Sequence, residues 1–370
     1  MTEIVDIRTA NEPRDVVHRA VYALSEGELV GLPTETGYVA AAHLLRQPAI
    51  ERLAALADGS RGVLNLRGER ELHDYVLSLG PLAERLARRC WPGPVILQFP
   101  VATDEGLLRA VPQATRERLI VDGEARFQES SDAVFRDVLK LLPSPLVTTT
   151  IDLAERGVAV AAAELAERSA GRIALCVDSG RSRFDQPATV VRIAGDDGEV
   201  VREGVVSAQT VSRLTRTMVL FVCTGNTCRS PMAEGLFRKL LVDRLQCSEE
   251  ELDGRGYMVL SAGLSASSGD PASPESVEAV RSAGVDLTEH ASRPLTAQLL
   301  RQADHIYTMT RGHRESIVSS HPELAAKTEL LSRDGRDISD PIGQSAAAYV
   351  SAKEEIEQNV RLLVDEFLGK

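Results

Sequence analysis

The first 213 residues alternate short apolar runs with amphipathic segments. The apolar runs, rich in Val, Ile and Leu, predict buried strands at 29–33, 63–66, 95–100, 146–151, 173–177 and 189–192. Between them, apolar residues recur at helical spacing and predict helices at 16–25, 50–57, 82–90, 133–141 and 161–169. Strands that alternate with helices are typical of α/β folds.

The rest of the chain repeats this alternation on a smaller scale. Apolar runs predict strands at 218–222, 258–261, 306–309 and 329–331, and helical patterns lie at 274–283, 296–303 and 349–368. Residues 207–217 lack Pro and Gly and predict a last short helix of the first half. A length of 370 residues suits two domains. We therefore expect an α/β fold with a twisted α/β domain at 1–213 and a small parallel sheet flanked by helices at 217–370.

The turn after the strand at 218–222 carries the candidate chemistry. It runs from Cys223 to Arg229 and leads into a helix for which we expect Ser230 at the N-cap and Pro231 at the first position. Backbone N–H groups of such a loop, together with the positive end of the helix dipole, favour a phosphate or another tetrahedral oxyanion. The same donors stabilise a thiolate at Cys223, and a thiolate is a nucleophile.

Two neighbouring side chains complete this hypothesis. The forked guanidinium of Arg229 matches two oxygens of a phosphoryl group, and the Ser230 hydroxyl can donate to the sulfur. An arginine six positions after a cysteine is common by chance, and a half-buried cysteine is usually a packing residue. The preceding strand, the Gly-Asn pair inside the loop and the Ser-Pro after it favour a catalytic site.

With these motifs, residues 218–370 resemble the low-molecular-weight protein phosphatases, whose signature loop is C-T-G-N-T-C-R-S-P. The resemblance implies a phosphocysteine at Cys223, with Arg229 as its partner and Asp340, in an Asp-Pro pair, as general acid and base; an Asp before Pro is otherwise a common turn. Substrate-binding positions would be Thr224, Gly225, Asn226, Thr227, Cys228 and Ser230. It also implies phosphorylated proteins as substrates, phosphate or vanadate as inhibitors, and no cofactor or metal.

Thr227 bears on the substrate. The phosphotyrosine branch of the family usually has Ile at this position, whereas the branch that resembles bacterial protein-arginine phosphatases has Thr. A small polar side chain leaves room for a flat, cationic guanidinium, which Asp340 would also face. Phosphoarginine is therefore expected over phosphotyrosine. Ile342 follows the Asp-Pro pair where an aromatic residue is common, so one wall of the pocket departs from the family pattern.

Other readings of the same residues stay open. The thiol-dependent arsenate reductases share the loop, but they need further cysteines downstream, and only Cys247 follows Cys228. Cys228 either forms a reversible disulfide with Cys223 or is a small residue that fills the loop. We expect His290 and His305 to have structural roles.

The first half carries the motif G-L-P-T-E-T-G-Y at 31–38, with W-P-G-P, P-A-T-V-V and R-E-G further along. With these motifs it resembles the YrdC-like family, which makes threonylcarbamoyl-AMP from threonine, bicarbonate and ATP for tRNA modification. This resemblance implies ATP as a ligand and tRNA as a partner of the pathway. The candidate pocket residues are Thr34, Thr36, Tyr38 and Arg61.

Two departures fall where this family binds nucleotide. Near Gly59-Ser60-Arg61 the expected Lys-x-Arg has no lysine, and the expected Ser-x-Asn is replaced by Thr148-Thr149-Thr150. We therefore predict that the domain keeps the fold and a pocket for a small ligand or for the shape of an RNA, but has lost efficient adenylate synthesis. The alternative function for the whole chain is a nucleotide or tRNA-modification protein with the phosphatase as its second domain.

Composition limits the remaining function classes. The net charge of −12 argues against nonspecific binding to nucleic acid. Five cysteines without paired spacing suggest reduced thiols in a cytosol. Residues 1–15 are polar and acidic, unlike a signal or transit peptide, and no apolar run approaches membrane-spanning length. We expect a soluble, cytoplasmic enzyme.

Overall fold

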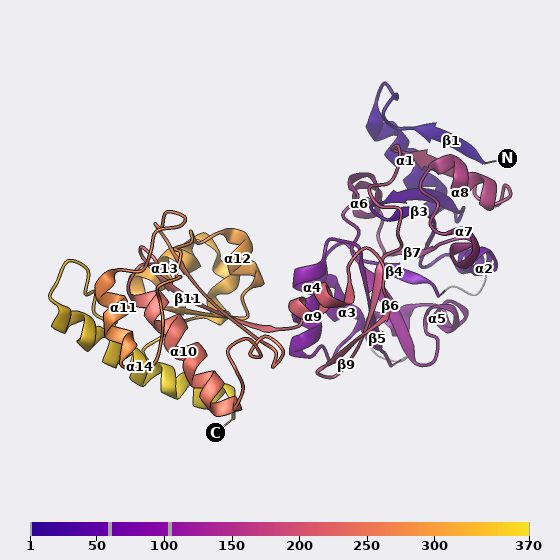
Figure 1. The fold of residues 1–370 in the computed structure, drawn as a ribbon. Helices are drawn as coiled ribbons and strands as arrows, with labels where there is room; N and C mark the ends of the chain where they lie inside the picture. The colour runs from indigo at the N-terminus through magenta and orange to yellow at the C-terminus, as the bar shows by residue number, and fades with distance from the viewer. Residues whose placement is uncertain (1, 58–60, 103–105, 370) are drawn as a thin grey trace. The chain divides into compact units, whose positions relative to one another are not determined.

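The computed structural model describes residues 2–57, 61–102 and 106–369. The chain divides into two compact units, residues 1–215 and 216–370 (Figure 1). Each unit has its own sheet and its own hydrophobic core. The fold class predicted from the sequence, α/β with two domains, is confirmed.

The described strands of the first unit form one mixed sheet of ten. Their order across the sheet is β1 (Glu3–Asp6), β8 (Leu175–Asp178), β2 (Val30–Thr34), β3 (Gly37–His43), β7 (Leu146–Thr149), β4 (Val63–Asn65), β6 (Glu124–Gln128), β5 (Val95–Pro100), β9 (Thr189–Ala194) and β10 (Asp197–Arg202). The tight β2–β3 hairpin turns at Glu35 and Thr36. This turn brings the residues predicted to line a pocket, from Thr34 to Tyr38, to one end of the two strands.

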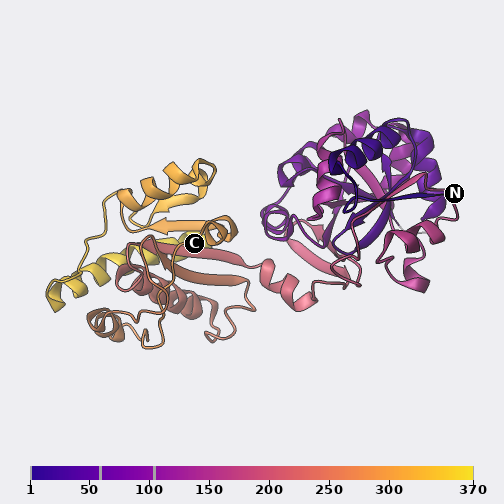
Figure 2. The ribbon, with the colours of Figure 1, turned by 90° about the horizontal axis from the view of Figure 1, so that it is seen from above.

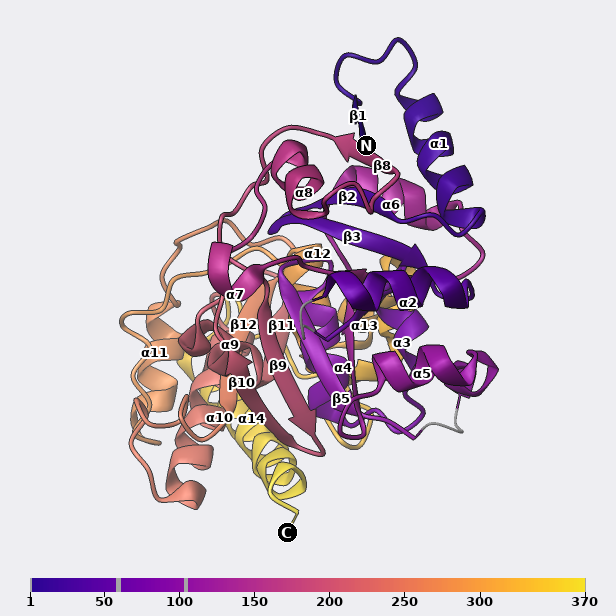
Figure 3. The same ribbon diagram turned by 90° about the vertical axis from the view of Figure 1, so that its right-hand side faces the viewer.

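Helices cover both faces of this sheet. They are α1 (Pro13–Ser25), α2 (Gln47–Leu56), α3 (Leu72–Tyr75), α4 (Pro81–Cys90), α5 (Gln113–Leu119), α6 (Ala133–Lys140), α7 (Leu153–Arg156), α8 (Ala162–Arg168) and α9 (Ala208–Leu214), with 3₁₀ turns η1 (Glu69–Glu71) and η2 (Gly106–Ala110). Helices α1 and α6 pack on one face of β2 and β3 (Figure 3). Leu24 and Phe135 are buried there. Helices α2, α4 and α8 contribute to the larger core, around Phe127.

The described strands of the second unit form a parallel sheet of four. Their order is β12 (Tyr257–Gly263), β11 (Thr217–Cys223), β13 (His305–Thr308) and β14 (Thr328–Leu330). Val219 and Phe221 face one core while Met218, Leu220 and Val222 face the other. Burial on both faces explains why this strand is a continuous apolar run instead of an alternating one.

Helices cover the two faces of the parallel sheet, and the candidate site lies at the end of β11. Helices α10 (Arg229–Leu245), α11 (Pro274–Arg281) and α14 (Ala346–Phe367) pack on one face. The other face is covered by α12 (Ala297–Gln302), α13 (Arg311–Ser320) and the 3₁₀ turn η3 (Pro322–Lys327). Figures 1 and 2 show α14, in yellow, running beside α10. The loop from β11 to α10 therefore lies at the carboxyl end of a central parallel strand, where α/β folds place ligands.

Some elements were not predicted from the pattern. The sequence pattern did not predict strands β1, β3, β6 and β10 or helix α13. The middle of β3 is three alanines, β10 is largely polar and exposed, and most of α13 is polar. Such segments carry weak periodic signals, and their conformation is set by the strands and helices against which they pack.

Candidate active site

Hydrogen-bond donors surround the sulfur of Cys223. The backbone N–H of Asn226 donates to Cys223 Sγ at 3.2 Å, and the Ser230 hydroxyl lies 3.0 Å from the same atom. The cysteine is 2% exposed at the end of β11. Hydrogen-bond donors at these distances give Cys223 the surroundings of a nucleophile.

The start of α10 differs from the prediction. The helix begins at Arg229, and Cys228 occupies the N-cap position without a side-chain capping bond. Ser230 and Pro231 are thus inside the first turn. The Ser230 hydroxyl contacts the sulfur of Cys223 and accepts from Asn226 Nδ2 at 3.0 Å. It therefore bonds to atoms of the loop and does not cap the helix.

Asn226 fixes the shape of the loop. Its backbone has φ 56°, in the left-handed region that Asn tolerates better than most residues. Its amide donates to Ser261 Oγ at 2.8 Å, and its Oδ1 accepts from the backbone N–H of Arg293 at 2.8 Å. His290 Nε2 lies 2.8 Å from the Asn226 carbonyl oxygen. Because Asn226 is fully buried, these bonds hold the loop in one conformation.

Arg229 brings a distant carboxylate to the loop. Its side chain is buried, Nη1 donates to the Ile338 carbonyl oxygen at 3.1 Å, and Nη2 forms an ion pair with Asp340. The Asp340 side chain is 43% exposed. The structure therefore places the three predicted catalytic residues, Cys223, Arg229 and Asp340, around one loop, although Asp340 lies far along the chain.

The other predicted loop residues line the same turn. Thr224 is exposed, Gly225 and Thr227 are half-buried, and Thr227 Oγ1 lies 3.6 Å from Cys228 Sγ. The Cys228 sulfur also lies 3.5 Å from Ser273 Oγ and 3.8 Å from Tyr349 Oη. All five cysteines have free thiols. A thiol with these neighbours fits a loop-packing role, and the disulfide with Cys223 stays a prediction.

Two further residues define the surroundings of this loop. The Ile342 side chain is 64% exposed, so no buried aromatic wall follows the Asp-Pro pair. His305 stands apart from the loop, in β13, where its ring packs against the edge of Phe367 at 4.8 Å. The second unit also has a histidine under the loop, His313, that the sequence did not single out, because nothing in the polar segment around it marks it.

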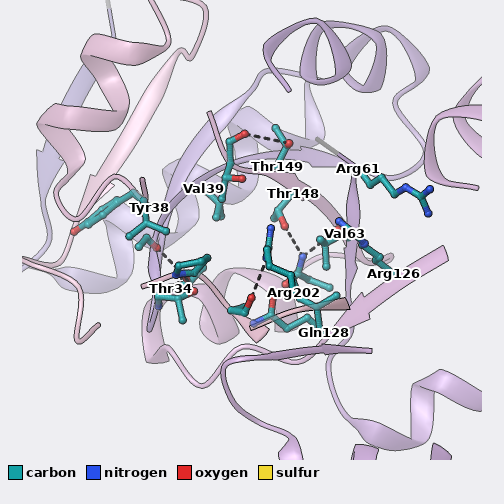
Figure 4. Close-up of a pocket in the computed structure, with 18 residues that line it drawn as sticks. Thr34, Tyr38, Val39, Arg61, Val63, Arg126, Gln128, Thr148, Thr149 and Arg202 are labelled. Atoms are coloured by element: carbon teal, nitrogen blue, oxygen red, sulfur yellow. Dashed lines mark hydrogen bonds between the residues drawn. The ribbon is translucent and has the colours of Figure 1, made fainter. Parts of the chain in front are cut away.

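The four predicted pocket residues of the first unit do meet. Thr34, Thr36, Tyr38 and Arg61 line one small pocket, with a volume of about 50 Å³, between the strands (Figure 4). Tyr38 Oη donates to the Gly180 carbonyl oxygen at 2.6 Å, so its hydroxyl is engaged at one side of the pocket. Gly59 and Ser60, where a Lys-x-Arg was expected, lie outside the described residues.

Two arginines of this pocket were missed. Arg126 and Arg202 line it together with Arg61, and Figure 4 shows Arg202 amid the lining residues. Burial, with Arg202 and Arg61 nearby, lowers the pKa of Arg126 to about 10. An asparagine is also present, since Asn65 Nδ2 donates to Thr148 Oγ1 at 2.8 Å. The lysine and the Ser-x-Asn motif are absent from the sequence, but Arg126 and Asn65 from other strands, and Arg202 at the start of the R-E-G motif, also line this pocket.

Neither a metal cluster nor a membrane-crossing helix is found in the described ranges. Within residues 2–57, 61–102 and 106–369, no group of three or more His, Cys, Asp or Glu is arranged to hold a metal ion. In the same ranges no helix is both long and apolar enough to cross a bilayer.

The fold and loop of the second unit define a class of protein, the small α/β phosphatases with a phosphate-binding loop between a parallel strand and a helix. The family model for low molecular weight phosphotyrosine protein phosphatases matches residues 218–370. A protein-arginine-phosphatase of Bacillus subtilis (strain 168) is 37% identical over 149 residues, which cover 39% of this chain and 93% of the relative. The chain belongs to the low molecular weight phosphotyrosine protein phosphatase family.

A second relative has a different description. It is the "probable low molecular weight protein-tyrosine-phosphatase EpsP" of Ralstonia nicotianae, 38% identical over 146 residues, or 38% of this chain and 90% of the relative. Overall identity therefore does not separate the two descriptions.

The first unit matches a different family. The Sua5/YciO/YrdC model, described as telomere recombination, matches residues 22–204. A solved structure of a Sua5 variant from P. abyssi is 17% identical, with a TM-score of 0.50, and covers 70% of this chain and 91% of its own. The first unit has a Sua5/YrdC-like fold, and both resemblances drawn from the sequence are confirmed.

Proposed function

We propose that the second unit hydrolyses phosphoarginine in proteins through a phosphocysteine at Cys223. The observation that carries this proposal is the grouping of a donor-surrounded Cys223 sulfur with the Arg229–Asp340 pair. The sulfur forms a bond to phosphorus as the bond from phosphorus to the arginine nitrogen breaks, and Asp340 gives its proton to that nitrogen. The backbone N–H groups of the loop and Arg229 stabilise the phosphoryl oxygens.

Hydrolysis of the intermediate reverses these roles. Asp340 takes a proton from a water molecule, which attacks phosphorus, and the bond from phosphorus to sulfur breaks. Cys223 leaves as a thiolate that accepts from the Asn226 N–H and from the Ser230 hydroxyl. Inorganic phosphate is the product, and the protein needs no cofactor or metal for either step.

Thr227 supports phosphoarginine over phosphotyrosine. Its short polar side chain is half-buried in the loop, where Ile would project a branched apolar group. The half-exposed Asp340 carboxylate offers a counter-charge to a guanidinium. A protein described as an arginine phosphatase is among the relatives, which adds weight to this preference.

Paired peptides test the proposal. Turnover of a phosphoarginine peptide and of the matched phosphotyrosine peptide is compared for the wild type, Thr227→Ile and Cys223→Ser, with Thr296→Ile, at the N-cap of α12, as a surface control. We expect the wild type to prefer phosphoarginine, Thr227→Ile to reverse the order, and Cys223→Ser to be inactive. A wild type that prefers phosphotyrosine would contradict the role of Thr227 but leave the mechanism intact. No turnover of either peptide would refute the proposed function.

A second candidate function concerns the first unit. We propose that its pocket binds a small phosphorylated ligand such as ATP without efficient adenylate synthesis, because the half-buried Arg126 and Arg202 bring positive charge to it. Calorimetry with ATP should show binding that Arg202→Ala weakens at least tenfold and that the exposed control Arg14→Ala leaves unchanged. Adding threonine and bicarbonate should release no pyrophosphate. Failure of the wild type to bind ATP, or release of pyrophosphate, would contradict this proposal.

A further inference from the structure

A buried histidine lies beneath the catalytic loop. His313, in the first turn of α13, is 8% exposed, and its Nε2 lies 2.9 Å from Thr224 Oγ1. Its backbone N–H donates to Thr310 Oγ1 at 3.2 Å, which anchors the residue at the capped helix start. Thr224 directly follows Cys223, so His313 touches the loop one residue from the sulfur.

The second ring nitrogen identifies the tautomer. His313 Nδ1 is buried and has no hydrogen-bond partner among the described residues. A neutral imidazole has one N–H donor and one bare acceptor nitrogen. Because a buried N–H without a partner is rarer than a bare acceptor, we assign the proton to Nε2, which then donates to Thr224 Oγ1.

Burial favours the neutral form of His313. Burial lowers its pKa from 6.5, and Arg229, on α10, lowers it further, whereas Asp340 and Asp337, in the segment before α14, oppose this. Protonation would place a second N–H on the buried, unpartnered Nδ1 and add a cation beside Arg229. A neutral ring of fixed tautomer positions a neighbour and does not exchange protons with the substrate.

The hydroxyl of Thr224 is oriented by this bond. Since Thr224 Oγ1 accepts from the imidazole, its own hydrogen must point away from His313, and Thr224 is exposed. We propose that His313 is a positioning residue that holds the Thr224 hydroxyl as a donor to the phosphoryl group bound in the loop. This inference rests on the proposed phosphatase function of the second unit.

A double-mutant cycle tests the pair. Thr224→Val, His313→Leu and the double variant are compared with the wild type by vanadate inhibition and by kcat and KM for p-nitrophenyl phosphate. Each single change should weaken vanadate inhibition and lower kcat about tenfold, as expected for one hydrogen bond to a charged oxyanion, and leave KM less affected. The double variant should lose no more than about tenfold in total, because the second change removes an interaction that is already absent.

Controls separate positioning from packing. His313→Gln, which keeps an N–H donor on a longer side chain, should recover most of the activity lost in His313→Leu, whereas His321→Leu, at the far end of α13, should have no effect. Losses that multiply in the double variant to about a hundredfold, or an unchanged Thr224→Val, would overturn the inference. If the wild type neither binds vanadate nor cleaves the ester, the proposed function itself fails.

Discussion

Gly263 should be intolerant of even one added methyl group because the catalytic loop packs directly on its backbone. It ends β12 opposite Cys223 in the parallel register. A Cβ built at this position would lie 2.6 Å from the Thr224 carbonyl oxygen and 2.9 Å from the Asn226 nitrogen. Comfortable non-bonded contacts begin at about 3.5 Å, so Gly263→Ala must displace the loop by on the order of 1 Å.

Both activity and stability should respond to this displacement. Overpacking costs about 1–3 kcal/mol of unfolding free energy, and a shift of about 1 Å in a catalytic group costs about a hundredfold in rate. Steady-state kcat/KM with p-nitrophenyl phosphate and thermal unfolding by circular dichroism measure the two effects. Gly312→Ala is the matched control, since its Cβ would approach nothing closer than 3.8 Å. If folded Gly263→Ala keeps kcat/KM within about threefold of the control, rigid support of the loop by β12 is refuted.

Two further changes probe buried charge. Burial raises the pKa of Glu129 to about 7 from 4.5, so its stabilising protonation is complete below pH 4.5 and lost as pH rises through 7. Glu129→Gln should therefore raise the unfolding free energy by about 3 kcal/mol at pH 8 and change it little at pH 4.5. Unfolding is monitored by the fluorescence of Trp91, the chain's one tryptophan. Equal gains in unfolding free energy at both pH values would contradict this prediction. Asp340→Asn should lower kcat by at least about a hundredfold yet tighten inhibition by inorganic phosphate, because Arg229 loses the carboxylate with which phosphate competes; weaker inhibition would contradict the pairing.

The part of the site that is contiguous in the chain could be predicted from the sequence. The strand, loop and helix from 217 to 245 have strong signals in order: a continuous apolar run, a Gly-Asn turn, then a periodic helix. Asp340 was found only through its Asp-Pro motif. Its contact with Arg229 spans 111 residues, and no periodic pattern reports such a pairing.

The pocket and loop residues that the sequence did not indicate lie in strands and a helix that it did not predict. Arg126 lies in β6 and Arg202 in β10, and His313 lies in α13; none of these elements was predicted. In β6 the buried Ala125 and Phe127 alternate with the pocket residues Arg126 and Gln128, so the strand is half polar and short. Without the strand, the direction of its arginine cannot be inferred from the sequence.

The pairing of Arg229 with Asp340 links substrate binding to proton transfer. A buried guanidinium requires partners, and here the Ile338 carbonyl and the Asp340 carboxylate supply them. A phosphoryl group that enters the loop offers two oxygens to the same fork and can replace the carboxylate without leaving Arg229 unpaired. Asp340, which is half-exposed, is then released from Arg229 toward the leaving group. The same replacement explains why the loop can keep its arginine buried and charged both before and after the substrate binds.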